Sequence, residues 1–145
     1  MTAAPPAVDI AIYRDEHFAA VSALWQVVFP GDPPWNRAEI AIPEKLRLQP
    51  DLFFVALSQS RVVGTAMAGY DGHRGWLYAI AVDPAHRRTG VGSALLAMAE
   101  TRLAHMGCSK INLQIRAGNE AVAGFYRAHG YAVEERVSMG KRLAG

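Results

Sequence analysis

The sequence predicts an α+β fold in which about four helices flank a central, mixed and mostly antiparallel sheet of six to seven strands. Short alternating or apolar segments, typical of strands, are interspersed with longer segments of helical periodicity. Two adjacent strand-like segments are joined by a short polar turn, which indicates a hairpin. The order of elements is not the strict alternation of strand and helix that an all-parallel sheet requires.

The chain begins with one predicted strand and two helical regions. The alternating segment "VDIAIYR" (8–14) predicts a strand, and apolar residues at helical spacing predict a helix over 16–29 with Asp15 as its cap. Pro43 interrupts a second helical pattern, so two short helical pieces are expected around residues 35–48.

The middle of the chain predicts a hairpin, a further strand and a long helix. The segments "DLFFVALS" and "VVGTAMAGY" flank a short turn, as the strands of an antiparallel hairpin do. The largely apolar "WLYAIAV" predicts a strand buried on both faces. After "DPAHRRTG", the apolar spacing predicts a helix to about Met106 that Gly107 ends.

The C-terminal part predicts a strand, a helix and a strand-like ending. "KINLQIR" (110–116) predicts a strand, and "AGNEAVAGFYRAHG" predicts a helix with Asn119 as cap and Gly130 as stop. "YAVEERVSMGKRL" (131–143) is expected to close the chain as one or two strands.

Composition restricts the class of protein. The chain has 145 residues, 51% of them hydrophobic and 19% charged, which predicts one globular domain over 1–145 with 1–7 as a loose leader. No apolar run reaches the ~20 residues of a membrane-spanning helix, and no signal-peptide pattern is present. We therefore expect no membrane partner and a cytoplasmic location.

Other classes of site are disfavoured as well. The net charge is only +2 and the cations are scattered, so no nucleic-acid partner is expected. The five histidines lack the spacing of metal ligands, which predicts no metal site. Cys108 is the only cysteine, so it forms no internal disulfide, and we interpret it as a structural residue.

The segment "HRRTGVGSALL" (86–96) places cations where a helix is predicted to begin. A helix N-terminus already carries about half a positive charge, which acidic residues usually balance. Here Arg87 and Arg88 precede Gly90 and Gly92, and glycines let backbone amides converge on an anion. The pattern predicts a phosphate-binding loop; an ordinary helix start with exposed arginines is the alternative.

Neither common nucleotide-binding motif fits this loop. A dinucleotide fingerprint needs a glycine where Leu95 stands, and a Walker loop needs a lysine, yet none lies between Lys45 and Lys110. A basic pyrophosphate loop with two glycines, directly after a strand, remains.

The motif "RRTGVG" resembles the R/Q-x-x-G-x-G/A signature of the GNAT superfamily of acetyl-CoA-dependent N-acetyltransferases, and "NEAVAGFYRAHGY" resembles the second landmark of that family. The resemblance covers roughly residues 8–143. It implies a GNAT-like fold and acetyl-CoA as co-substrate. The stretches "PPWN", "YDGHRG" and "GKRL" resemble a bacterial branch of the YpeA type.

The resemblance also implies which residues bind the co-substrate. The backbone of Ile80 and Val82 would pair with the pantetheine arm, and an amide there could stabilise an oxyanion. Asn119 would contact a pantetheine amide or simply cap its helix. The diphosphate would lie on the amides of Arg87, Arg88, Thr89, Gly90, Val91, Gly92 and Ser93.

Tyr126 is the predicted catalytic residue. It lies about 10.5 Å along the helix from Asn119 and on the same face, so a bound co-substrate that runs along this face would contact both residues. The resemblance implies that its phenol protonates the departing thiolate as a general acid. The helical pattern alone allows another interpretation, in which Tyr126 belongs to a core stripe with Val122 and His129.

The sequence does not indicate a base for the amine. The ribosomal-protein alanine acetyltransferases have a glutamate where this chain has Gln114, and glutamine accepts no proton at neutral pH. Water, Asp71, His73 and Glu44 are the alternatives, with a turn-stabilising role equally open for His73. Trp35 is interpreted as a buried loop anchor rather than as part of an acceptor pocket.

The sequence thus predicts an N-acetyltransferase that moves an acetyl group from acetyl-CoA to a primary amine by direct attack in a ternary complex. The acceptor is a small-molecule or protein amine. A non-catalytic acyl-CoA-binding sensor or interaction module is the alternative, because Gln114 replaces the glutamate. The oligomeric state is left open, and a homodimer is one option.

Overall fold

The computed structural model describes residues 8–143 as two compact units, one ending at Leu113 and one starting at Gln114. The leader predicted for residues 1–7 lies outside the described residues. Within residues 8–143, no helix has both the length and the apolar character needed to cross a bilayer.

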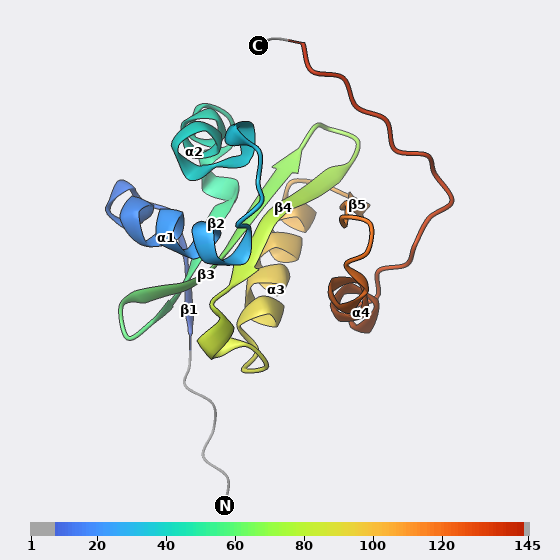
Figure 1. Cartoon of the computed structure of the whole chain (residues 1–145). Coiled ribbons are helices and arrows are strands. Elements are labelled where there is room, and N and C mark those ends of the chain that lie inside the picture. Colours follow the sequence, from blue (N-terminus) through green and yellow to red (C-terminus); the bar gives the residue numbers. More distant parts are fainter. Residues whose placement is uncertain (1–7, 144–145) are drawn as a thin grey trace, which may run out of the picture. The chain divides into compact units, whose positions relative to one another are not determined.

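A five-stranded sheet forms the centre of the first unit, with the strand order β1-β2-β3-β4-β5 (Figure 1). Strands β1 to β4 pair antiparallel, and β5 is parallel to β4. The predicted α+β class, the mixed sheet and the β2–β3 hairpin are confirmed. The strands are β1 (Asp9–Ile12), β2 (Phe53–Ser58), β3 (Arg61–Tyr70), β4 (Gly75–Val82) and β5 (Ile111–Asn112).

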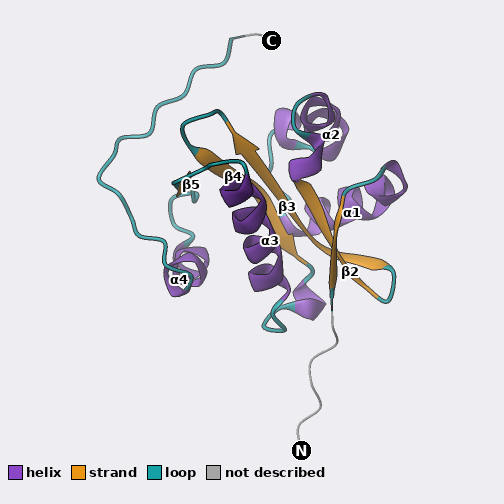
Figure 2. Ribbon diagram, turned by 180° about the vertical axis from the view of Figure 1, so that it is seen from behind, coloured by secondary structure: helices purple, strands orange, loops and turns teal. Residues whose placement is uncertain are grey.

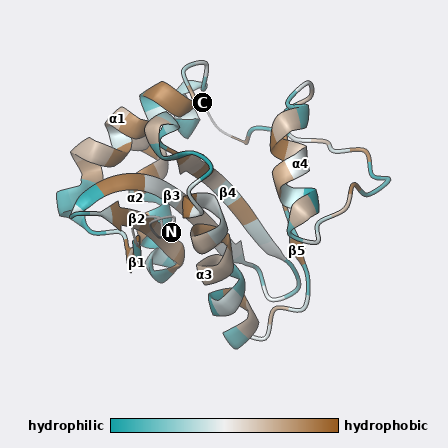
Figure 3. Cartoon of the chain, turned by 90° about the horizontal axis from the view of Figure 1, so that it is seen from below, coloured by the Kyte–Doolittle hydropathy of each residue, from teal (hydrophilic) through white to brown (hydrophobic). Residues whose placement is uncertain are grey.

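Helices cover both faces of this sheet. Helices α1 and α2 lie against one face and α3 lies against the other, as the views in Figures 2 and 3 show. Helix α4 belongs to the second unit. The helices are α1 (Phe18–Val28), α2 (Ala38–Arg47), α3 (Val91–His105) and α4 (Glu120–Ala128).

The expected count of six to seven strands is wrong, because the structure describes five. The predicted strand over 110–116 is reduced to β5, and residues 131–143 form no strand. Val133, Val137, Met139 and Leu143 of the latter segment are 78% exposed or more, so these apolar side chains are not buried. A strand requires a hydrogen-bonded partner, and alternation in the sequence does not supply one.

Pro43 lies inside α2 and not at a break. The helix runs from Ala38 to Arg47, and the interruption in this region falls at Arg37, after a 3₁₀ turn. Pro43 removes only the N–H that would bond to the carbonyl of Glu39. Burial of Ile42, which is 1% exposed, helps to hold the helix together across that position.

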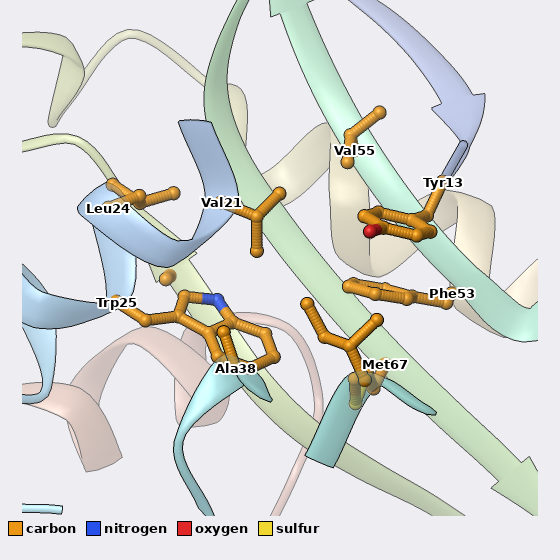
Figure 4. Close-up of a cluster of buried hydrophobic side chains, with 10 residues drawn as sticks. Tyr13, Val21, Leu24, Trp25, Ala38, Phe53, Val55 and Met67 are labelled. Carbon is orange, nitrogen blue, oxygen red and sulfur yellow. The ribbon is translucent and has the colours of Figure 1, made fainter. Parts of the chain in front are cut away.

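An aromatic cluster fixes the sheet under α1 and α2 (Figure 4). The ring of Tyr13 stacks on Phe53 with centroids 4.5 Å apart, and Trp25 of α1 lies 6.1 Å from Phe53. On the opposite face, Leu95 and Leu103 of α3 are fully buried. The sheet is therefore packed against α1 on one face and against α3 on the other. This packing fixes the end of β4, from which the next loop starts.

Gly64 of β3 lies where side chains of α3 pack closely on the sheet. A Cβ at this position would lie 2.9 Å from Leu95 Cδ1 and 3.0 Å from Val91 Cγ1. We expect Gly64→Ala to lower the free energy of unfolding by about 1–3 kcal/mol, because an overpacked core must shift. Urea denaturation measures the change. Gly31→Ala is the control, since a Cβ there meets nothing within 4 Å, and an equal loss in both variants would contradict the close approach.

Candidate active site

One edge of β4 is open where the pantetheine contacts are predicted. β4 pairs with β5 only at Gly75 and Trp76, and no described strand pairs with that edge from Leu77 to Val82. The pairing with β3 also changes register, and Ala79 and Ile80 have no partner there. Unpaired backbone groups on a strand edge can bind an extended ligand as a further strand would.

The loop between β4 and α3 follows this edge directly. Asp83 accepts a hydrogen bond from the amide of Ala85 (2.9 Å), which fixes the start of the loop. The hydroxyl of Thr89 donates to the carbonyl of His86. Arg88 has φ 63° and Gly90 has φ 88°. Left-handed residues of this kind turn loop amides toward one side and form a concave anion site.

The positive end of the α3 helix dipole is not balanced by a capping side chain or by an acidic residue in the first turn. No side chain caps the helix at Gly90, and its first turn contains no acidic residue. Arg87 and Arg88 are exposed just before it. A Cβ at Gly90 would meet nothing within 4 Å, so the space in front of the helix is open. This arrangement fits a diphosphate group, which would balance both the arginines and the helix dipole.

The structure brings the seven predicted loop residues together, because they are contiguous. Thr89 is exposed, whereas Gly92 and Ser93 are half-buried in the first turn of α3. Val91 is only 2% exposed and packs its side chain against β3, so only its backbone can serve a ligand.

Asn119 occupies the N-cap position of α4 in the second unit. Its side chain makes no capping hydrogen bond, although its backbone N–H donates to the carbonyl of Arg116 (3.1 Å). The residue is exposed. Of the two predicted roles, capping by the side chain is not observed, and contact with a ligand stays a prediction.

Tyr126 is buried within the second unit, with 8% exposure. Its ring meets Phe125 and Tyr131 edge to face, with centroids 5.1 and 5.7 Å apart. Burial raises the pKa of Tyr126 to about 12, so the phenol keeps its proton through the neutral range. The core stripe considered as an alternative is not formed, because Val122 and His129 are exposed.

Gln114 and Asp71 are both engaged in hydrogen bonds of their own. The side-chain amide of Gln114 donates to the hydroxyl of Ser138. The carboxylate of Asp71 accepts from the amides of Arg74 (2.7 Å) and His73 (2.8 Å), and these bonds lower its pKa. A carboxylate with a lowered pKa is a weak base, so Asp71 stabilises the turn.

The candidate base Glu44 and the aromatic residue Trp35 both lie at the surface. Glu44 is exposed on α2. The interpretation of Trp35 as a buried anchor is wrong, because its side chain is 42% exposed in the 3₁₀ turn before α2. Neither position is fixed by burial, so neither is identified as part of the catalytic site.

Sequence reasoning missed a polar cluster beside β3 and β4. Lys45 donates to the carbonyl of Ala68, and the Gln49 side chain bonds to the amide (2.9 Å) and carbonyl (2.8 Å) of Tyr70. Tyr78 of β4 is 51% exposed. Desolvation lowers the pKa of Lys45 and raises that of Tyr78. No motif marks these residues, because the fold brings them together from separate elements.

Comparison with known proteins identifies relatives of this chain. The model of the family described as "Acetyltransferase (GNAT) family" matches residues 13–131. An acetyltransferase of Pectobacterium atrosepticum is 42% identical over 137 residues, which cover 93% of this chain and 95% of the relative.

Solved structures show the same fold. The aminoglycoside acetyltransferase AAC(6')-Iy, in complex with the bisubstrate analogue CoA-S-monomethyl-acetylneamine, is 24% identical over 95% of this chain and 99% of its own, with a TM-score of 0.75. The PaiA N-acetyltransferase of Thermoplasma acidophilum, in complex with coenzyme A, is 20% identical over 90% and 93%, with a TM-score of 0.77.

The matched family region extends from the β1 end to Tyr131 and includes both sequence motifs. The assignment to a YpeA-type branch stays a prediction. The chain belongs to the Acetyltransferase (GNAT) family, which confirms the predicted GNAT-like fold, the predicted acetyltransferase and acetyl-CoA as its co-substrate.

Proposed function

We propose that this protein is an N-acetyltransferase that moves the acetyl group of acetyl-CoA to a primary amine by direct attack in a ternary complex. The observation that carries the proposal is the uncapped N-terminus of α3, which follows the open edge of β4 through a loop with two arginines. Family membership supplies the acetyl-transfer chemistry.

The proposed donor site uses that path in the first unit and Asn119 in the second. The loop amides from Arg87 to Ser93 bind the diphosphate, and the arginine side chains add charge. The backbone of Ile80 and Val82 on the open edge binds the pantetheine arm. The uncapped side chain of Asn119 contacts a pantetheine amide.

The chemical step needs one proton donor and a neutral amine. The amine nitrogen attacks the carbonyl carbon of the thioester, and the carbon–sulfur bond breaks with its electron pair on sulfur. Tyr126 gives its proton to this thiolate and regains one from solvent. The substrate ammonium loses one proton to water before the attack, and the nitrogen loses a second proton to water as the amide forms, since Gln114 and Asp71 are poor acceptors.

The acceptor is proposed to be a small-molecule amine. The support is the aminoglycoside acetyltransferase with its bisubstrate analogue, which shares the fold over almost the whole chain. Release of free thiol from acetyl-CoA across a panel of amines, with mass spectrometry of the products, tests the proposal. Acetylated amine supports it.

The alternative is a non-catalytic sensor of acyl-CoA. The observation that favours it is the engagement of Gln114 with Ser138 at the position where related enzymes have a glutamate. Calorimetric binding of CoA without turnover on any amine would support the sensor and overturn the enzyme.

A further inference from the structure

Thr65 of β3 is the one polar side chain that is buried in the described part of the chain, with 0% exposure. Its hydroxyl accepts a hydrogen bond from the indole N–H of Trp25 (2.9 Å) and donates to the carbonyl of Ala79 (2.8 Å). Because an indole nitrogen only donates and a hydroxyl has one proton, the direction of both bonds is fixed. Thr65 therefore connects α1 to the irregular part of β4.

Ala79 has a backbone conformation that needs support. Its φ is 49°, in the left-handed region that residues with a side chain rarely adopt. Such a residue costs on the order of 1–3 kcal/mol and persists where the surroundings fix it. The bond from Thr65 acts on the carbonyl of this residue, at the place where β4 departs from the regular β3 ladder.

The carbonyl of Ala79 determines where the next amide points. No described peptide bond is cis, and in a trans peptide the C=O and the following N–H point in opposite directions. The carbonyl points toward Thr65 on β3, so the N–H of Ile80 points away from β3. The edge of β4 on that side has no strand partner at Ile80.

We propose that Thr65, held by Trp25, is a positioning residue that aims the N–H of Ile80 at the acetyl carbonyl, where it stabilises the oxyanion formed on amine attack. This inference rests on the proposed function. Thr65 does not touch the substrate; it acts through the Ala79–Ile80 peptide. The rigid connection through α1 keeps that peptide from relaxing toward a regular strand.

Thr65→Val tests the hydroxyl with little change in shape. The variant leaves the Ala79 carbonyl without its bond, and the Ile80 amide loses its fixed direction. Removal of a whole oxyanion donor costs about 10²–10³-fold in kcat, so we expect misdirection of one to lower kcat by about 10- to 10²-fold. The KM for acetyl-CoA should change much less than kcat, because the proposed diphosphate contacts of the loop at α3 are untouched.

Two variants separate positioning from stability. Thr65→Ser keeps the hydroxyl and should restore kcat to near the wild-type value. Val55→Ala removes buried volume from the same core cluster without a bond to Ala79, so it should lower the melting temperature but not kcat in assays well below that temperature. The inference is overturned if Thr65→Val keeps the wild-type kcat. It is also overturned if the kcat of Thr65→Ser or of Val55→Ala is lowered as much as that of Thr65→Val.

The amide resonance of Ile80 gives a second readout that does not depend on turnover. Titration with acetyl-CoA should shift this resonance in the wild type and in Thr65→Ser, and much less in Thr65→Val. A shift without acetyl transfer to any amine would refute the proposed enzyme and leave the position of the amide supported. Acetyl transfer together with equal shifts of the Ile80 resonance in all three proteins would refute only the role of Thr65 and not the proposed enzyme.

Discussion

Tyr126→Phe is expected to lower kcat by about 10²–10⁴-fold, the contribution of a positioned general acid, with no change in the affinity for CoA. The phenol is buried against Phe125 and Tyr131, so loss of one hydroxyl leaves the aromatic packing in place. Steady-state thiol release and calorimetric titration with CoA measure the two quantities separately.

Tyr131→Phe is the matched control, because it removes a hydroxyl from the ring that meets Tyr126. It should leave kcat close to that of the wild type. Full activity of Tyr126→Phe would exclude Tyr126 as the proton donor, and equal losses in both variants would indicate a general effect of the aromatic cluster.

The raised pKa of Tyr126 also predicts a dependence of stability on pH. The folded state holds the proton up to about pH 12, whereas an unfolded tyrosine loses it near 10. Between about pH 10 and 12 the folded state therefore binds more protons than the unfolded state. The contribution of Tyr126 to the free energy of unfolding is present below about pH 10 and is lost as pH rises toward about 12. Urea denaturation at pH 9 and pH 11 should show a larger loss for the wild type than for Tyr126→Phe.

Gly90→Glu is expected to raise the Kd for CoA by about 10- to 10²-fold, because a carboxylate at the α3 N-terminus would compete for the amides that are proposed to bind the diphosphate. Bonds to charged groups contribute about 1.5–3 kcal/mol, which corresponds to that change in Kd. The position is open, since a Cβ there meets nothing within 4 Å. Calorimetry at fixed salt measures the affinity.

Gly72→Glu matches this variant in backbone strain and added charge. Gly72 has φ 94° and Gly90 has φ 88°, and both positions are free of contacts at Cβ. The two variants should lose similar stability, while only Gly90→Glu loses CoA binding. Equal affinities of the two variants for CoA would contradict diphosphate binding at the α3 N-terminus.

The sequence predicted the elements whose signals are local. The polar turn between β2 and β3 specified a hairpin, and apolar spacing with Gly107 specified α3. The predicted anion loop also rests on a local signal, because Arg87 to Ser93 are contiguous and the proposed binding would use backbone amides at a helix start. A contiguous site needs no knowledge of distant contacts.

Predictions failed where partners decide the outcome. The segment 131–143 has the alternation of a strand, yet it forms none within its own unit. Trp35 was interpreted as a buried loop anchor, but burial depends on which surface covers a side chain, and that of Trp35 is 42% exposed. Pro43 was given too much weight, because one missing hydrogen bond does not end a helix that packing supports.

By itself the sequence determined the α+β class and the family, and it predicted a phosphate-binding loop, since these depend on periodicity and on motifs of adjacent residues. Only the tertiary structure decided how β4 is bent at Ala79 and Ile80, which edge of that strand is open, and which hydroxyl holds the bend. These features arise from hydrogen bonds between residues 14 and 40 positions apart, Thr65 with Ala79 and Trp25 with Thr65, and no local pattern encodes such a meeting.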